Sequence, residues 1–466
     1  MSEPADAPRR RWPRVVLVVS GVLALSAVAA ILYLDARGNR GLEKELAAWR
    51  ASGDPLLALQ DQPATSELPE ALRNWLASYD RPPCNACGDA LDEAAIQALA
   101  DCAQPYADAK LRERAFDEAC VAALRDPVRA RALTDCERAL LEARCAPSLA
   151  CAAGARAARE LPVIPARELL SGGRPLEQVA GTVNILSLVR ASRCAVDAMR
   201  YRMLHGELDE AAEFARDGFE IARVASGTPL LTGYLGWTVT LNLALGGLEE
   251  LLQALPPGTD LVWFESELAR LDPRLELIDG VREERLAAHN TLRRFSSADI
   301  PGVHVVTPDE ALSWLDRRML GVTHDEYLEG FARALAHLES PAWREPPAAP
   351  YFVPASWPFS AFFQHLDLIR PNFEPLIDVA VMLAARIELA RAALVNHRDG
   401  TAAARAWLAG RIDPFDGKPL RSRVDPDGVL VMWSVGVDRV DDGAPRRPPG
   451  CIDWKPKDID WLSPVR

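Results

Sequence analysis

The cysteines are the residues of this 466-residue chain whose spacing restricts its chemistry most. Seven of the nine lie in one stretch: Cys84, Cys87, Cys102, Cys120, Cys136, Cys145 and Cys151. A zinc site of the knuckle type needs two CxxC pairs, and only Cys84 and Cys87 form one. A thioredoxin-like redox pair needs its CxxC at the start of a helix that follows a strand, whereas Arg81-Pro82-Pro83 precedes it here. We therefore interpret the cysteines as structural disulfides, with a Cys84/Cys87 redox pair and a metal site as alternatives.

Helix geometry predicts how some of these cysteines pair. Asp126-Pro127 has the residue types of a helix start and separates two helical patterns, at Tyr106–Leu124 and Val128–Arg144. In an antiparallel hairpin, positions equidistant from the turn face each other. The predicted pairs are Cys120 with Cys136, and Cys102 with Cys145 or Cys151. Such nested bridges would stabilise a hairpin that is too short to bury much apolar surface alone.

Histidines and paired acids give no recognisable catalytic pattern. His289 follows Glu283 and Glu284 at offsets that do not align ligands on one face of a helix. His324 lies in Thr323-His324-Asp325-Glu326, which we interpret as a capping box at a helix start. The pairs Glu249-Glu250 and Glu283-Glu284 are interpreted as solvated helix faces. The sequence thus predicts no catalytic and no cofactor-binding residue.

One uncharged run, Val15 to Leu34, has the length of a transmembrane helix. A helix of this length, at a rise of about 1.5 Å per residue, spans roughly the 30 Å hydrocarbon core of a bilayer. The arginine cluster at 9–14 favours a cytoplasmic location for the N-terminal segment, residues 1–14. A signal peptide cleaved at Ala27-Val28-Ala29 is the alternative, but the apolar run is longer than such peptides have. We expect a single-pass protein of a bacterial inner membrane, with its bulk in the periplasm.

The composition is that of a globular body. Apolar residues make up 49% of the chain, which allows a substantial core. The formal net charge is −13, and the basic residues after the apolar run are mixed with acids. Nucleic acid is therefore excluded as an expected partner, because it would require a basic stripe.

Apolar residues recur at helical spacing through residues 41–410, where alternation at strand period is almost absent. The predicted helices are Leu176–Leu204, Glu207–Ala225, Pro229–Leu255, Leu275–Phe295, Pro308–Leu320, His324–Leu338 and Phe373–His397. The turn at His205-Gly206-Glu207 resembles that of a tetratricopeptide-type hairpin, without a second copy at that repeat's period. The expected fold is mainly α: irregular stacked helical hairpins, partly tetratricopeptide-like, after one transmembrane helix (15–34) and before a small β tail. The expected segments are a Cys-rich helical region (35–160), a helical-hairpin domain (161–340), a Pro/aromatic strap (341–372), a long helix (373–410) and the tail (411–466).

The strap combines prolines with aromatic residues. Prolines such as Pro346, Pro347 and Pro350 leave little capacity for helix, and aromatic side chains such as Trp343 and Tyr351 are too frequent for a solvated linker. We interpret the segment as packed over the helical core. The alternative is an aromatic-lined loop that docks a partner.

The tail joins turn-forming residues to one β-rich run. The motif Asp413-Pro414-Phe415-Asp416-Gly417-Lys418-Pro419-Leu420 and the turn Asp425-Pro426-Asp427-Gly428 predict a hairpin with strands at 419–424 and 429–435. An acidic loop and a closing Asp458-Ile459-Asp460-Trp461 follow. This order of motifs resembles the C-terminal domain of the G-type pseudopilin of type II secretion.

The pseudopilin resemblance implies a calcium ion bound in the acidic loop. By position it implies Asp438, Asp458 and Asp460 as ligands, and loop oxygens are what a hard cation needs. The chain departs from the pattern at Ala444–Lys457, which is longer and contains Cys451, and its apolar run lacks the pilin processing motif. The resemblance therefore concerns the tail and not assembly into a pilus.

These features together predict a non-enzymatic periplasmic scaffold or adaptor. It would be anchored through residues 15–34 and engage other envelope proteins, in secretion or pilus-like machinery. The alternative is a periplasmic enzyme with an unrecognised helical site, either a redox protein that uses Cys84 and Cys87 or a hydrolase.

Overall fold

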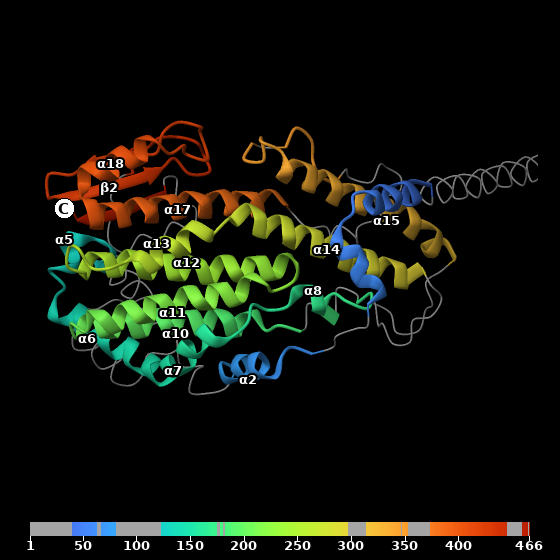
Figure 1. The fold of residues 1–466 in the computed structure, drawn as a ribbon. Helices are drawn as coiled ribbons and strands as arrows, with labels where there is room; N and C mark the ends of the chain where they lie inside the picture. Colours follow the sequence, from blue (N-terminus) through green and yellow to red (C-terminus); the bar gives the residue numbers. More distant parts are fainter. Residues whose placement is uncertain are drawn as a thin grey trace, which may run out of the picture.

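The computed structural model describes residues 40–62, 67–80, 123–174, 178–179, 182–296, 314–345, 347–352, 373–444, 459–464 and 466. Over these residues the chain is mainly helical, with one small antiparallel sheet late in the sequence (Figure 1). The predicted transmembrane helix, 15–34, lies outside them. None of the helices within the described ranges is long and apolar enough to cross a membrane.

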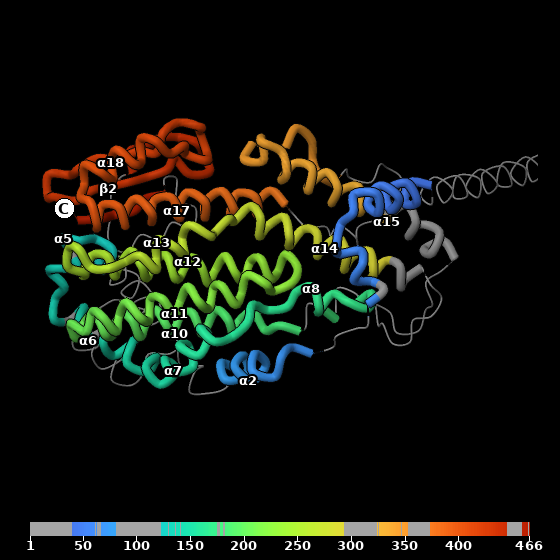
Figure 2. Tube along the Cα trace, viewed as in Figure 1, coloured from blue at the N-terminus to red at the C-terminus, as the bar shows by residue number. Residues whose placement is uncertain are grey.

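Three helices form the centre of the body and pack side by side (Figure 2): α10 (Ile185–Leu204), α11 (Leu208–Ser226) and α12 (Leu230–Ala254). Asn184 caps α10 by accepting a hydrogen bond from the Leu186 amide, at 3.1 Å. Gly206 follows the end of α10 at φ +75°, in the left-handed region that favours glycine. The predicted boundaries of this region are confirmed, except that α10 starts later than predicted.

Helix α12 is buried around most of its circumference, as expected for a segment with so few polar residues. Its glycines lie where neighbours approach. A Cβ on Gly236 would lie 2.6 Å from Ile185 Cγ2, and one on Gly247 would lie 3.4 Å from Met199 Sδ. Larger residues at these positions would push the helices apart, so the glycines set the close packing of α12 against α10.

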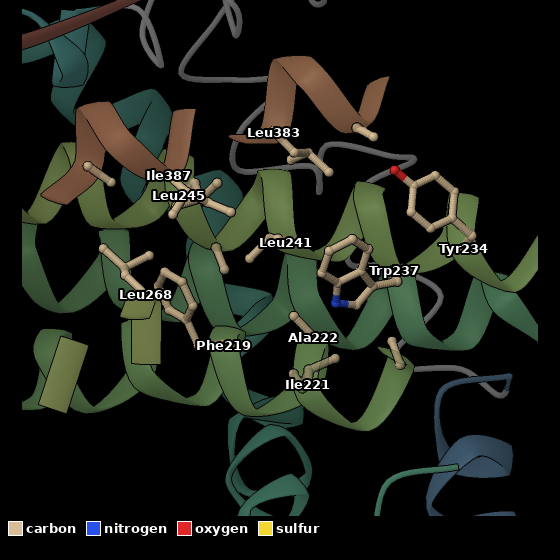
Figure 3. Packing of buried hydrophobic residues seen from close by; sticks show 14 of the residues in the cluster. Phe219, Ile221, Ala222, Tyr234, Trp237, Leu241, Leu245, Leu268, Leu383 and Ile387 are labelled. Atoms are coloured by element: carbon tan, nitrogen blue, oxygen red, sulfur yellow. The ribbon is translucent and has the colours of Figure 1, made fainter. Parts of the chain in front are cut away.

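A second group of helices packs beside this centre: α13 (Val262–Arg270), α14 (Pro273–Ser296), α15 (Trp314–Glu339), α17 (Phe373–Asp399) and α18 (Thr401–Ala409). Figure 3 shows Leu383 and Ile387 of α17 packed with Leu241 and Leu245 of α12. Helix α15 runs without a break through Thr323, so the predicted capping box there is wrong. From His324 onward the helix buries Tyr327, Leu328 and Phe331 among its neighbours, and this packing outweighs the local start signal.

Shorter elements cover the other side of the centre: η1 (Pro55–Asp61), α2 (Glu70–Ser78), α5 (Pro127–Ala130), α6 (Asp135–Cys145), η3 (Ala146–Ser148), α7 (Leu149–Ala157), η4 (Ala158–Glu160) and α8 (Ala166–Leu169). Asp126 accepts a hydrogen bond from the Val128 amide, at 3.0 Å, as predicted for a helix start. The predicted helix Val128–Arg144 is nevertheless two helices, because Thr134 and Glu137 form a capping box that starts α6.

The tail forms a three-stranded antiparallel sheet of order β1–β2–β3: β1 (Arg421–Val424), β2 (Val429–Ser434) and β3 (Ile459–Pro464). The predicted hairpin is confirmed as β1 and β2. The third strand was not predicted. Leu430 and Met432 on the central strand point into the same hydrophobic core as the helices. Asn396 of α17 donates hydrogen bonds to Ser463 Oγ and Pro464 O, both at 2.8 Å. The tail is therefore part of the helical body's core.

The described part of the strap packs on the helices. Trp343 and Tyr351 are buried, and the Phe352 ring stacks on Phe373 with centroids 5.7 Å apart. A Cβ on Gly330 would lie 2.2 Å from the Phe352 ring, so α15 leaves a space that this ring occupies. The aromatic side chains Trp343, Tyr351 and Phe352 thus pack on the helices, whereas 346 and 353–372 lie outside the described residues.

Candidate functional site

A cavity of about 440 Å³ opens where the α11–α12 turn meets α8 and α14. Its lining comes from three separate stretches of sequence: 163–168, 226–234 and 276–283. Arg167, Glu168 and Asp279 are exposed at its mouth, whereas Thr228 and Glu283 are buried. The cavity is thus built by tertiary packing and not by one local motif.

Helix α14 supplies the acids of the cavity. Glu276, Asp279 and Glu283 follow one another at three and four residues, so they share one helix face. Gly280 lies on the same face, where a Cβ would be 3.5 Å from the Cβ of Tyr234 and 3.6 Å from Leu230 O. The glycine therefore lets the first turn of α12 come close to the acids.

Two glutamates of α14 bind the start of α12. Glu283 Oε2 accepts a hydrogen bond from the Leu230 amide at 3.1 Å, and Glu284 Oε2 accepts one from the Leu231 amide at 3.2 Å. These amides have no partner within a helix, and the helix N-terminus attracts negative charge. Leu230 has φ +74°, a left-handed conformation that is rare for a residue with a branched side chain. Such strain is often found at functional sites.

Burial raises the pKa of several acids of α14 at the cavity. Burial raises the pKa of Glu283 to about 8, although the hydrogen bond from Leu230 opposes the shift. Burial, with the charges of Asp279 and Asp272, raises the pKa of Glu276 to about 7. Burial also raises the pKa of Glu284 to about 7, and that of Asp279. Groups that titrate in this range inside a cavity are typical of binding and catalytic sites.

Two residues of the lining, Tyr234 and Thr228, have hydroxyls with no hydrogen-bond partner among the described residues. The Tyr234 hydroxyl belongs to a residue that is 4% exposed, and the Thr228 hydroxyl to one that is 6% exposed. A buried polar group without a partner costs about 1–3 kcal/mol. The lining residues therefore include two buried hydroxyls without a partner among the described residues. They also include several carboxyl groups and one guanidinium group, that of Arg167. This arrangement suits a ligand that carries positive charge and can hydrogen-bond.

The interpretation of the paired acids as solvated faces is wrong for two of the pairs. Glu283 is buried at the cavity, and Glu249 and Glu250 are buried in the core. Glu250 accepts hydrogen bonds from Arg200 Nε at 2.7 Å and Nη2 at 2.8 Å. The one sequence signal for the cavity is the spacing of the α14 acids around Gly280.

The predicted calcium ligands are placed in part. Asp438 is exposed in the loop after β2, where its Oδ1 accepts a hydrogen bond from the Val440 amide at 3.1 Å. Asp460 lies on β3 opposite Trp433, and Asp458 lies outside the described residues. No three acidic, histidine or cysteine side chains among the described residues are arranged to hold a metal ion. Calcium binding stays a prediction.

The other acids of the tail have a structural role that the sequence did not reveal. Arg421 pairs with Asp413 Oδ2 at 2.8 Å, with Asp441 Oδ2 at 2.8 Å and with Asp416. Asp413 is fully buried and also accepts hydrogen bonds from Ser434 Oγ and from the amide of Val435. One arginine thus connects the turn motif, the hairpin and the acidic loop.

The cysteines of the expected framework are described only in part. Cys84, Cys87, Cys102 and Cys120 lie outside the described residues, as does the side chain of Cys136. Cys151 is disulfide-bonded, but no disulfide bond joins two of the described side chains. Cys145 is a buried free thiol, which leaves Cys151 as the expected partner of Cys102. The remaining pairings stay predictions.

Two histidines that are 35 residues apart in the sequence, His289 and His324, contact each other in the core. His289 Nδ1 and His324 Nε2 lie 2.9 Å apart, and both residues are buried. Trp49 lies edge-on to His289, with ring centroids 5.8 Å apart. Burial, with the neighbouring His289, lowers the pKa of His324 to about 3. His324 therefore stays neutral at physiological pH, and its contact with His289 connects α14 with α15.

No family model, no curated protein and no solved structure matches this chain. The likeness of the tail to the G-type pseudopilin therefore stays a prediction from the order of its motifs. Evidence for the function must come from the geometry of the chain itself, and the acidic cavity between α8, α12 and α14 is its best-developed site.

Proposed function

We propose that this chain is a membrane-anchored binding protein of the bacterial envelope, and that its acidic cavity takes a small organic cation. The observation that carries the proposal is the set of α14 acids in the lining, Glu276, Asp279 and Glu283, beside the buried hydroxyls of Tyr234 and Thr228, which have no hydrogen-bond partner among the described residues. A ligand with ammonium and N–H groups would satisfy the acids and the hydroxyls together.

The excess of acidic residues in the cavity lining favours a cationic ligand. The lining holds Glu168, Glu276, Asp279 and Glu283 against Arg167. Because the pKa values of Glu276 and Glu283 are near 7 and 8, an entering ammonium would displace protons from them. Binding of a cation should therefore release protons and become tighter as the pH rises from 6 to 8.

The envelope location and the adaptor role are parts of the proposal that rest on the sequence. The uncharged run 15–34 supports an anchor with the helical body on the periplasmic side. The motif order of the tail supports a connection to secretion or pilus-like machinery. A ligand-binding body on such an anchor would act as a non-enzymatic scaffold or adaptor for envelope proteins.

Calorimetric titration of the full-length protein with 1,4-diaminobutane tests the cavity. The diamine should bind, and 1,4-butanediol, which has the same length without charge, should not. Glu276→Gln should weaken binding roughly tenfold or more, because a charge-assisted contact contributes about 1.5–3 kcal/mol. Asp209→Asn, at an exposed position on α11, is the matched control and should bind like the unmodified protein. Equal binding of diamine and diol would refute the cationic site.

Crosslinking in intact membranes tests the adaptor role separately. The full chain should capture specific envelope proteins that a control of residues 1–40 alone does not. If both baits recover the same proteins, the helical body has no adaptor function, whatever the cavity binds.

A hydrolase is the second candidate, because Glu283 and Glu276 have pKa values in the range that general acid–base catalysis uses. The hydrolase alternative predicts that the bound ligand is turned over and that Glu276→Gln abolishes this turnover. A binding protein would release the diamine unchanged. The redox alternative concerns Cys84 and Cys87, outside the described residues, and a disulfide from either to a distant cysteine would exclude it.

A further inference from the structure

A second cavity, of about 480 Å³, is lined by residues at the ends of α10 and α12. Helix α5 contacts α12 and lies at this end of the body (Figure 1). Its lining includes the last residues of α10 and α12, the segment 130–138 and residues 464 and 466. The acidic cavity lies by the start of α12, so the two cavities belong to opposite ends of that helix.

The charge of this second cavity is positive, in contrast to the net charge of the chain. Arg131, Arg138 and Arg466 line it, against one acid, Glu250. The charge of Glu250 is already met, because Arg200 binds both of its carboxylate oxygens and Arg125 Nε lies 3.5 Å away. The cavity therefore presents its guanidinium groups without a competing anion.

Two of these arginines donate hydrogen bonds to carbonyl groups at the C-terminal ends of α10 and α12. Arg138 Nη1 donates to Leu204 O at 3.3 Å, and Arg466 Nη2 donates to Leu252 O at 3.1 Å and Leu255 O at 2.8 Å. These carbonyls are unpaired within their helices and carry partial negative charge.

Other guanidinium N–H groups of the lining have no partner among the described residues. Within the described part of the chain, Arg466 Nε is buried without a hydrogen-bond partner, and Arg131 forms no hydrogen bond or ion pair. Burial and the nearby charge of Arg131 lower the pKa of Arg466. Two guanidinium groups that repel each other across a cavity are stabilised by an anion between them.

Apolar side chains complete the lining. Leu124, Leu133, Met203 and Ala254 contribute to the wall, and Pro257 borders it. A fully hydrated inorganic anion would leave this surface unused. A ligand with a charged head and an apolar body would cover the arginines and the apolar wall at once.

We propose that this cavity binds a small amphiphilic carboxylate, with its head between Arg131 and Arg466 and its apolar part against Leu124, Leu133 and Met203. The site is independent of the cationic ligand of the first cavity. Binding here would add a second specificity to the same body.

Three probes of one shape test the proposal on the full-length protein: 4-phenylbutanoate, 4-phenylbutanamide and 4-phenylbutylamine, followed by calorimetry. The carboxylate should bind, and the amide and the amine should bind at least roughly tenfold more weakly, because they lose the charge-assisted hydrogen bonds. Arg131→Gln should reduce the affinity for the carboxylate by a similar factor. Arg131 is exposed, so the variant should fold normally.

Arg405→Gln is the matched control, since Arg405 is an exposed arginine on α18 away from the cavity lining. It should leave the affinity for 4-phenylbutanoate unchanged. Equal affinities for the carboxylate and the amide, or equal losses in the two arginine variants, would overturn the proposal. Unchanged binding of 1,4-diaminobutane by Arg131→Gln would show that the two sites are separate.

Discussion

Replacement of Glu283 by glutamine should change how stability depends on pH. Glu283 is buried and its pKa is raised from 4.5 to about 8, so the native state binds its proton more tightly than the unfolded state does. Stability from this group is fully present below pH 4.5 and is lost as the pH rises through about 8. A shift of this size corresponds to an upper bound of about 5 kcal/mol at 1.36 kcal/mol per unit.

Glutamine keeps the shape of the side chain and an oxygen that can accept the hydrogen bond from the Leu230 amide. It removes the charge, so Glu283→Gln should match the unmodified protein at pH 5 and exceed its stability at pH 8 by about 2–4 kcal/mol. The midpoint of urea unfolding, followed by circular dichroism at both pH values, measures this difference. Asp209→Asn, which removes an exposed acid, should show no such pH-dependent gain.

The reasoning fails if Glu283→Gln is equally destabilised at pH 5 and pH 8. That result would mean that the carboxylate form stabilises α12 and that the burial of Glu283 does not control its titration. Because each variant is compared with the unmodified protein at the same pH, the titration of other groups cancels.

Two other predictions concern the buried polar groups of the core. Glu250→Leu should cost about 3–5 kcal/mol because it leaves the buried Arg200 guanidinium with Asp197 as its remaining partner, whereas Glu250→Leu combined with Arg200→Met should recover more than half of that loss in a double-mutant cycle by urea unfolding. A sum of single effects without coupling would argue against the pair. The pKa of His324 is lowered from 6.5 to about 3, so the stability from its neutral form is lost as the pH falls below 6.5, by about 2 kcal/mol at pH 5. His324→Gln should remove this acid loss, and an unchanged slope between pH 7 and 5 would contradict it.

Helix boundaries could be predicted where the sequence has unambiguous stop signals, as at Gly206. The capping box at Thr323 was misleading because a local start signal of about 1 kcal/mol cannot interrupt a helix whose face is buried by its neighbours. The break at Thr134 shows the reverse, since that short segment has less burial to override its cap. Local signals therefore decide boundaries only where packing does not.

The cavities could not be predicted from periodicity. The acidic cavity joins segments near Ile164, Thr228 and Glu283, and no pattern in one of them reports the others. Helix α12 is apolar on nearly all sides, so its sequence does not show which polar residue faces a cavity and which faces an ion pair. The buried partner of Glu250 is Arg200, fifty residues earlier, and that of Glu249 is the Leu462 amide, so both contacts depend on tertiary structure.

Strand β3 makes the folding of the helical body depend on contacts that are distant in sequence. Gln253 Nε2 donates to Leu462 O at 2.7 Å, across 209 positions of sequence, and Trp461 is fully buried among side chains of the helical body. A nascent chain cannot close this part of the core until residues 459–464 have left the ribosome. Long-range closure of this kind slows folding and leaves apolar surface open in the meantime.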